Sequence, residues 1–224
     1  MKRTKLSQRT LPAYTALQER MNALTHGLGI PAAAGGFAFL LSRAAESGRL
    51  STVLGACIYG FSMIAMYAVS AAYHALKPST AKKVMQVIDH CTIYFLIAGT
   101  YTAILLGAVI RENPGLARGM LVFQWVLAIT ATVLTAIDLK KYSIFSMICY
   151  IGMGWAIIPF WRQILAILTA PGFTLLLLGG IAYTIGSVLY GLGKRRNKWM
   201  HTVFHIFVLL GSFLQYLAVL FYAL

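Results

Sequence analysis

Residues 173–192 read FTLLLLGGIAYTIGSVLYGL, a run of 20 residues without a charged side chain. A helix of this length crosses the ~30 Å hydrocarbon core of a bilayer. The basic loop Lys194–Lys198 follows at once, and after it comes another apolar segment that begins at His201. Long apolar runs and short basic clusters alternate in this way along the whole chain, which predicts a helical membrane protein.

The composition of the 224 residues agrees with this interpretation. Hydrophobic residues make up 59% of the chain and charged residues only 11%, whereas a soluble domain has about 25% charged residues. The net charge of +14 would suit nucleic-acid binding, but the basic residues lie in short clusters between apolar segments, so membrane lipids are the expected partners and nucleic acid is not. Cys57, Cys91 and Cys149 all fall within apolar segments and are interpreted as small hydrophobic residues.

Seven apolar segments are interpreted as membrane spans. They predict an all-α bundle of seven transmembrane helices over residues 25–224, preceded by a basic segment of residues 1–24. The first segment could instead be a cleaved signal peptide, but the patterned stretch Glu19–His26 before it favours a retained span. Short connections favour antiparallel neighbours. The predicted spans are residues 25–41, 51–74, 87–109, 120–137, 143–160, 173–192 and 201–222.

The lysines and arginines of the loops predict the orientation. Of 19 such residues, five fall on the side of the C-terminus, and the others fall on the side of the N-terminus. The positive-inside rule therefore places the N-terminus in the cytoplasm and the C-terminus outside. An odd number of spans keeps the basic loop Lys194–Lys198 on the cytoplasmic side. The five residues of the other side are Arg43, Arg49, Arg111, Arg118 and Arg162.

Glycines crowd the sixth predicted span, at Gly179, Gly180, Gly186, Gly191 and Gly193. Small residues let membrane helices approach one another closely, so helix packing is the expected role. The same glycines could instead pack against a second copy of the chain, so the sequence does not decide whether the protein forms a homo-oligomer.

The ionisable residues of the spans gather in one layer at the predicted cytoplasmic ends. His26 opens the first span, His74 closes the second, Asp89 and His90 open the third, and His201 and His205 open the seventh. His201 and His205 follow Lys198 by three and seven residues, or about 4–11 Å along a helix. The histidines do not enter the lysine and arginine count that gives the orientation. Their gathering at the cytoplasmic ends of the spans is therefore an independent observation. The remaining acids, Glu46, Glu112 and Asp138, fall near loops and are expected to be solvated.

The spacing within this layer favours a metal site. His201 and His205 lie four residues apart, as do Ser70 and His74, so each pair projects from one helix face. A carboxylate such as Asp89 costs about 2.5–3.5 kcal/mol in a span and persists more readily if paired or coordinated. Three imidazoles with a carboxylate nearby suit Zn²⁺, and three protein ligands plus water is the open pattern of catalytic sites. Another divalent ion that binds imidazole stays open.

Other residues of the layer have more than one interpretation. A single histidine at the end of a span is commonly an interfacial residue, which is the alternative to a ligand. His90 points about 100° away from Asp89 and is either a packing residue, a hydrogen-bond partner of the site or a ligand. Glu19, Asn22 and His26 share one helical stripe, which either caps the first span or hydrogen-bonds to the site.

At these residues the sequence resembles a known family, the bacterial hemolysin III-like branch of the progestin and adipoQ receptor (PAQR) family. The similar stretches cover nearly the whole chain in family order, and together they are specific. One departure is Ala103, where relatives often have proline. The stretches are Glu19–Gly27, Ser70–His74, Asp89–Thr102, Gly154–Trp155, Gly179–Tyr183 and His201–Val208.

The resemblance implies a seven-helix protein of the bacterial cytoplasmic membrane with a buried zinc. It implies His74, His201 and His205 as the zinc ligands, with Ser70 and Asp89 beside them. It also places the chain in a wider group of proposed membrane hydrolases that includes ceramidases, and with proteins of membrane homeostasis.

Two functions follow, and the sequence leaves open whether the protein is an enzyme. The first is a zinc-dependent intramembrane hydrolase of a lipid amide or ester, in which Asp89 accepts a proton and Ser70 hydrogen-bonds the reacting oxygen. The alternative is a non-enzymatic regulator of membrane stress or fluidity with a structural zinc. A pore-forming hemolysin or ion transporter is less favoured, because the polar residues form one layer and not a path across the bilayer.

Overall fold

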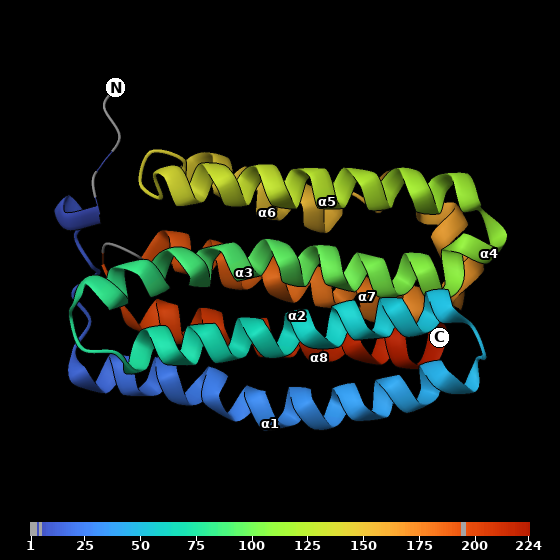
Figure 1. The fold of residues 1–224 in the computed structure, drawn as a ribbon, viewed down its shortest axis with the longest axis horizontal. Helices are drawn as coiled ribbons and strands as arrows, with labels where there is room; N and C mark the ends of the chain where they lie inside the picture. Colours follow the sequence, from blue (N-terminus) through green and yellow to red (C-terminus); the bar gives the residue numbers. More distant parts are fainter. Residues whose placement is uncertain (1–3, 5, 194–195) are drawn as a thin grey trace.

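The computed structural model describes residues 4, 6–193 and 196–224, and within them every regular element is a helix. The helices run side by side in one bundle, with the start of α1 at one end and the C-terminus at the other (Figure 1). Lys2, Arg3, Lys5, Lys194 and Arg195, which contributed to the predicted orientation, lie outside the described residues. The elements are η1 (Leu6–Gln8), α1 (Ala16–Glu46), α2 (Leu50–Ala75), α3 (Thr80–Ile104), η2 (Leu105–Val109), α4 (Ile110–Glu112), α5 (Pro114–Ile137), α6 (Ser143–Trp155), η3 (Ile158–Phe160), α7 (Trp161–Gly193) and α8 (Trp199–Tyr222).

Local capping sets where several helices begin. The Thr15 side chain accepts a hydrogen bond from the Gln18 backbone N–H at 3.2 Å, and the Gln18 side chain accepts one from the Thr15 N–H at 3.0 Å. This reciprocal capping box starts α1 nine residues before the predicted first span. Ser79 caps α3 in a similar way, and Asn113 caps α5 just before Pro114.

Six helical stretches among the described residues are long and apolar enough to cross a membrane. Seven spans were predicted, and the two numbers differ because residues 143–193 form one helical stretch of 51 residues. Alone, α6 has 13 residues, or about 20 Å, which is shorter than the hydrocarbon core. The stretch is interrupted by η3 and by a kink at Thr169. This residue has a φ of 61° and lies two positions before Pro171. The all-helical membrane fold is thus confirmed. The count of seven is not, because the predicted spans 143–160 and 173–192 are not shown as two separate spans.

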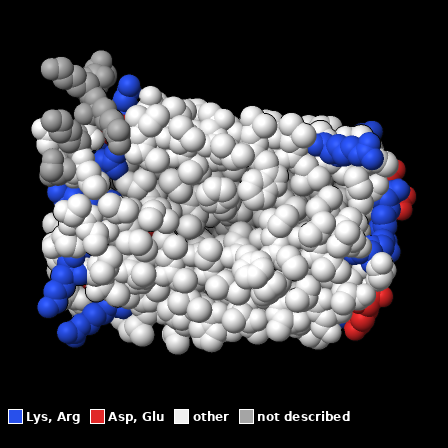
Figure 2. All heavy atoms as spheres, in the orientation of Figure 1, with Lys and Arg blue, Asp and Glu red and all other residues white. Residues whose placement is uncertain are grey.

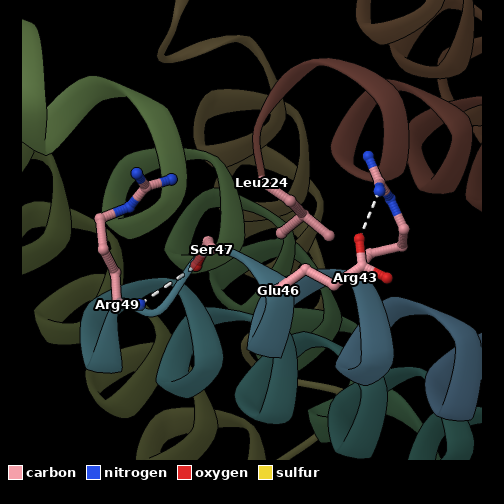
Figure 3. Close-up of a pocket in the computed structure, with 5 residues that line it drawn as sticks. All are labelled: Arg43, Glu46, Ser47, Arg49 and Leu224. Atoms are coloured by element: carbon pink, nitrogen blue, oxygen red, sulfur yellow. Dashed lines mark hydrogen bonds and ion pairs between the residues drawn. The ribbon is translucent and has the colours of Figure 1, made fainter.

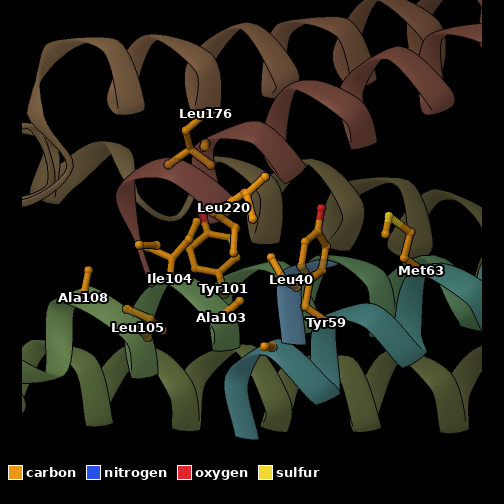
Figure 4. Close-up of a cluster of buried hydrophobic side chains, with 14 of the residues drawn as sticks. Leu40, Tyr59, Met63, Tyr101, Ala103, Ile104, Leu105, Ala108, Leu176 and Leu220 are labelled. Atoms are coloured by element: carbon orange, nitrogen blue, oxygen red, sulfur yellow. The ribbon is translucent and has the colours of Figure 1, made fainter. Parts of the chain in front are cut away.

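The interior of the bundle is centred on α3. In the apolar part of the stretch Thr80–Glu112, which comprises α3, η2 and α4, 72% of the residues are buried, against 22–44% in the other five stretches. Leu40 of α1, Tyr59 of α2, Tyr101 of α3 and Leu220 of α8 meet in this core (Figure 4). Large side chains on the outside are also apolar, as at Ile144, which is 75% exposed. Figure 2 shows the result as a wide band without lysine or arginine, which gather at the two ends.

A row of glycines joins α7 to α8. Gly172, Gly179, Gly186 and Gly193 recur every seven residues and therefore share one face of α7. A Cβ added at Gly186 would lie 2.7 Å from the Cβ of Phe207, and the other three would meet α8 atoms at similar or shorter distances. In contrast, a Cβ at Gly191 would have no neighbour within 4 Å. The predicted packing role therefore applies to Gly179, Gly186 and Gly193, and not to Gly191.

Candidate metal centre

Three buried histidines converge at the end of the bundle that carries the N-terminus. His74 lies in the last turn of α2, and His201 and His205 lie in the first two turns of α8. One ring nitrogen of each lies within 4.8 Å of the corresponding atoms of the other two. The Nε2 atoms of His74 and His201 face each other at 3.0 Å. The predicted i,i+4 pair of α8 is thus brought against the histidine of α2.

Hydrogen bonds at the far side of two rings fix their tautomers. His74 Nδ1 lies 2.7 Å from Glu19 Oε2, so it carries the proton that it donates to this carboxylate. His205 Nδ1 lies 3.1 Å from Thr25 Oγ1. Because Thr25 donates its own hydroxyl proton to the Asn22 carbonyl at 2.9 Å, it accepts from His205. In the neutral form of both histidines Nε2 then keeps its lone pair, as a metal ligand requires.

The donor set fits a Zn²⁺ ion. Two imidazoles on one tetrahedral Zn²⁺, at about 2.0–2.1 Å each, would have their nitrogens roughly 3.3 Å apart. The 3.0 Å between His74 and His201 is close to that value, so a small adjustment is enough. The three histidines can therefore bind a metal ion, and they match the three predicted ligands.

The two other predicted residues of the centre lie beside His74. Ser70 lies one turn before it on α2 and is buried, as is Asp89 of α3. The Asp89 carboxylate is within hydrogen-bonding reach of Ser70 and close enough to His74 for a direct electrostatic interaction. The arrangement thus brings a carboxylate and a hydroxyl next to His74.

The remaining predicted residues divide into two groups. Glu19 and Asn22 contact the centre, because Glu19 accepts from His74 and the Asn22 carbonyl lies 3.3 Å from His205 Nδ1. His26 stacks on His205, with ring centroids 3.8 Å apart, but does not belong to the converging group of ring nitrogens. His90 donates from Nδ1 to the Gln86 carbonyl at 2.8 Å, and the same nitrogen lies 3.8 Å from Asp89 Oδ2, so His90 contacts Asp89 without belonging to the converging ring nitrogens.

Sequence reasoning missed several residues around the centre. Tyr14 stacks on His201, with centroids 5.3 Å apart, and burial raises the pKa of its phenol. Thr25 and Lys82 hold His205 and Glu19 respectively. The capping box of Thr15 and Gln18 was a usable signal, because it extends α1 to include Glu19. The partners of Lys82 depend on which helices are neighbours and have no sequence signal.

One acid expected to be solvated is buried. Asp138, at the end of α5, is only 2% exposed, so this expectation was wrong, whereas Glu46 and Glu112 are exposed. Its carboxylate accepts from the backbone N–H of Thr4 at 2.8 Å, Lys140 at 3.2 Å and Lys141 at 3.1 Å. These bonds hold the pKa of Asp138 at about 2. The acid thus ties the N-terminal segment to the loop after α5.

A pocket of about 270 Å³ lies at the other end of the bundle (Figure 3). It is lined by side chains around the loop between α1 and α2, namely Arg43, Glu46, Ser47 and Arg49, together with Leu224. Arg43 pairs with Glu46 of the same helix. None of the predicted site residues lines this pocket, so it is separate from the candidate centre.

Fold and centre together define a multi-pass helical membrane protein with three buried histidines able to bind a metal ion. The family model described as "Haemolysin-III related" matches residues 14–216. The chain belongs to this family, which confirms the resemblance drawn from the sequence.

Curated relatives support the same assignment. The hemolysin-3 homolog of Bacillus subtilis (strain 168) is 35% identical over 209 residues, covering 93% of this chain and 96% of the relative. Hemolysin-3 of Bacillus cereus is 36% identical over 207 residues, covering 92% of each. The human monocyte to macrophage differentiation factor is 27% identical over 212 residues, covering 92% of this chain and 84% of the relative.

Proposed function

We propose that this protein is a zinc-dependent intramembrane hydrolase of a lipid amide or ester. The observation that carries the proposal is the convergence of His74, His201 and His205, with Asp89 and Ser70 beside them, in a bundle with an apolar exterior. When bound, Zn²⁺ supplies a Lewis acid that polarises a carbonyl and lowers the pKa of water toward about 7.

The residues of the chain have the following roles in this proposal. Asp89 accepts the proton of a water molecule as its oxygen adds to the acyl carbon, and Ser70 donates a hydrogen bond to the developing oxyanion. The acyl bond to nitrogen or oxygen then breaks, and the proton held by Asp89 passes to the leaving amine or alcohol. The products are a fatty acid and an amine or alcohol, so atoms and charge balance.

The proposal includes a membrane topology. We place the protein in the bacterial cytoplasmic membrane with seven spans, its N-terminus in the cytoplasm and its C-terminus outside. The start of α1 and the C-terminus at opposite ends of the bundle support an odd number of crossings (Figure 1). The centre then lies within reach of acyl chains and headgroups near the cytoplasmic surface, with membrane lipids as substrates.

The test uses purified protein loaded with zinc and incubated with lipid amides and a total lipid extract. We expect release of fatty acid by the wild type, and none by Asp89→Asn with its zinc still bound. No release by zinc-loaded wild type would overturn the hydrolase proposal. Elemental analysis of His74→Ala, His201→Ala and His205→Ala tests the ligands, since zinc retained by any variant removes that histidine from the set.

A second function is favoured by a separate observation. The centre joins helices that are distant in sequence, since α2, α8 and α1 meet at His74, His201 and Glu19. A zinc there would hold these helices together in a regulator of membrane stress without chemistry. In that case zinc-loaded Asp89→Asn keeps the biological effect of the wild type in cells, whereas an enzyme loses it.

A further inference from the structure

Glu19 of α1 connects the metal centre to a buried lysine. Its two carboxylate oxygens have different partners: Oε2 lies 2.7 Å from His74 Nδ1, and Oε1 lies 2.7 Å from Lys82 Nζ. The three residues come from α1, α2 and α3. Glu19 therefore cannot turn toward either partner without losing the other.

Lys82 is buried and contacts several polar and aromatic groups. Its side chain is only 3% exposed, although lysine is seldom buried. Its ammonium group donates to the Leu76 carbonyl at 2.8 Å, approaches the His74 carbonyl at 3.5 Å and lies 5.1 Å above the Tyr73 ring. A buried charge needs such compensation, so the lysine is fixed in place and in turn fixes Glu19.

We propose that Glu19 and Lys82 are positioning residues that keep the Nε2 lone pair of His74 directed toward the metal. This inference rests on the metal site proposed above and extends it to a second layer of residues. The carboxylate accepts a hydrogen bond from Nδ1–H, so that in the neutral ring Nε2 is the unprotonated nitrogen, and Lys82 holds the carboxylate where it can do so. Partners of this kind orient ligating histidines and raise their basicity.

The variant Glu19→Gln should disrupt this arrangement in a specific way. Lys82 has only donors, so the amide oxygen of the glutamine turns toward it. The amide NH₂ then faces His74 Nδ1 and makes it an acceptor, which moves the ring proton to Nε2. We expect zinc affinity to fall by about 10–100-fold, measured by competition with a chelator. Glu46→Gln, at the other end of the bundle, is the matched control and should keep wild-type affinity.

Two double variants separate positioning from simple stapling of the helices. Glu19→Gln/Lys82→Met and Glu19→Leu/Lys82→Met both remove the two charges. Only the first retains an acceptor for His74, because without Lys82 the amide oxygen is free to turn toward Nδ1. We expect it to bind zinc at least about 10-fold more tightly than the leucine variant, and to restore the wild-type visible spectrum of bound Co²⁺. Thermal unfolding of the metal-free forms serves to show that both fold.

The outcomes distinguish the two levels of the proposal. Equal zinc affinities and equal Co²⁺ spectra in the two double variants, with metal bound by the wild type, overturn the positioning role and leave only a helix staple. Wild-type protein that takes up neither Zn²⁺ nor Co²⁺ overturns the metal site itself, and this inference with it.

Discussion

Glu19, at one end of the bundle, is largely buried between His74 and Lys82, whereas Glu46, at the other end, lies exposed beside Arg43 of its own helix. The side chains of Glu19 and Lys82 are 20% and 3% exposed, against 58% and 50% for Glu46 and Arg43. The first pair joins separate helices, and the second joins residues three apart on α1. Both are ion pairs by distance, yet only the first is shielded from water.

The difference in exposure between the two ion pairs indicates which pair contributes more to the stability of the fold. Exposed pairs contribute about 0–1 kcal/mol because water and salt screen them. Removing one partner of a buried pair leaves the other charge uncompensated, which is far more costly. A charge count along the sequence treats the two pairs alike, but among these two described pairs it is Glu19–Lys82 that joins separate helices.

The largest expected effect is that of metal. A ligand present at about 1,000 times its Kd stabilises the folded state by about 4 kcal/mol. We therefore expect zinc to raise the unfolding temperature of the wild type in detergent, and a chelator to lower it again. His205→Ala should show neither shift, whereas Arg49→Gln, at the exposed end, should respond like the wild type. A shift of wild-type size in His205→Ala would contradict the site.

The next effect compares the two glutamates directly. Glu19→Gln leaves the buried Lys82 ammonium without a counter-ion, so we expect the metal-free protein to lose about 3 kcal/mol of unfolding free energy. Glu46→Gln should change it by less than about 0.5 kcal/mol. Equal losses, measured by denaturant titration in mixed micelles, would break the comparison between the two ends.

A third prediction compares two glycines of α7 that differ in packing against α8 and involves no charged residue. The Cβ introduced by Gly186→Ala would lie 2.7 Å from the Cβ of Phe207, which cannot swing away. We expect a loss of about 1–3 kcal/mol, as for other overpacked interfaces. The control Gly191→Ala, on the same helix, has no atom nearby and should leave the unfolding transition unchanged.

The smallest effect concerns Asp138. Its pKa of about 2 lies below the value of about 3.9 in an unfolded chain. A lowered pKa means that the stabilisation is present above about pH 4 and is lost as the pH falls through about 2. Asp138→Asn retains an acceptor for Lys140 and Lys141 but loses the charge and one bond, so about 1 kcal/mol should disappear at neutral pH. Its unfolding temperature should then depend less on acid than that of the wild type.

Part of the fold could be predicted from the sequence because the apolar runs of α2 and α8 are nearly as long as these helices. The predicted spans 51–74 and 201–222 differ from α2 and α8 by no more than two residues at either end. The start of α1 was missed because its capping residues, Thr15 and Gln18, are polar and lie before the apolar run. The number of membrane spans in residues 143–193 could not be predicted from hydropathy, because a short helix and a kink interrupt one continuous apolar stretch.

The candidate centre was predictable where it follows from helix periodicity. Spacing of four residues placed His201 beside His205 and Ser70 beside His74. Spacing alone does not show that Thr25 receives the proton of His205, because the two are 180 positions apart and meet only when α1 packs on α8. Asp138 was misjudged for the same reason, since its partner Thr4 is 134 positions away.

The capping box that starts α1 early also has a consequence for biosynthesis. It places Asn22 in the first helical turns of α1, which is synthesised long before α8, whereas Thr202 and His205, the partners of Asn22, lie on α8. Until α8 is inserted, the chain holds an acid, a lysine and one histidine of the centre without the two imidazoles that complete it. The group of three histidines is therefore complete only after α8 has packed against α1 and α2.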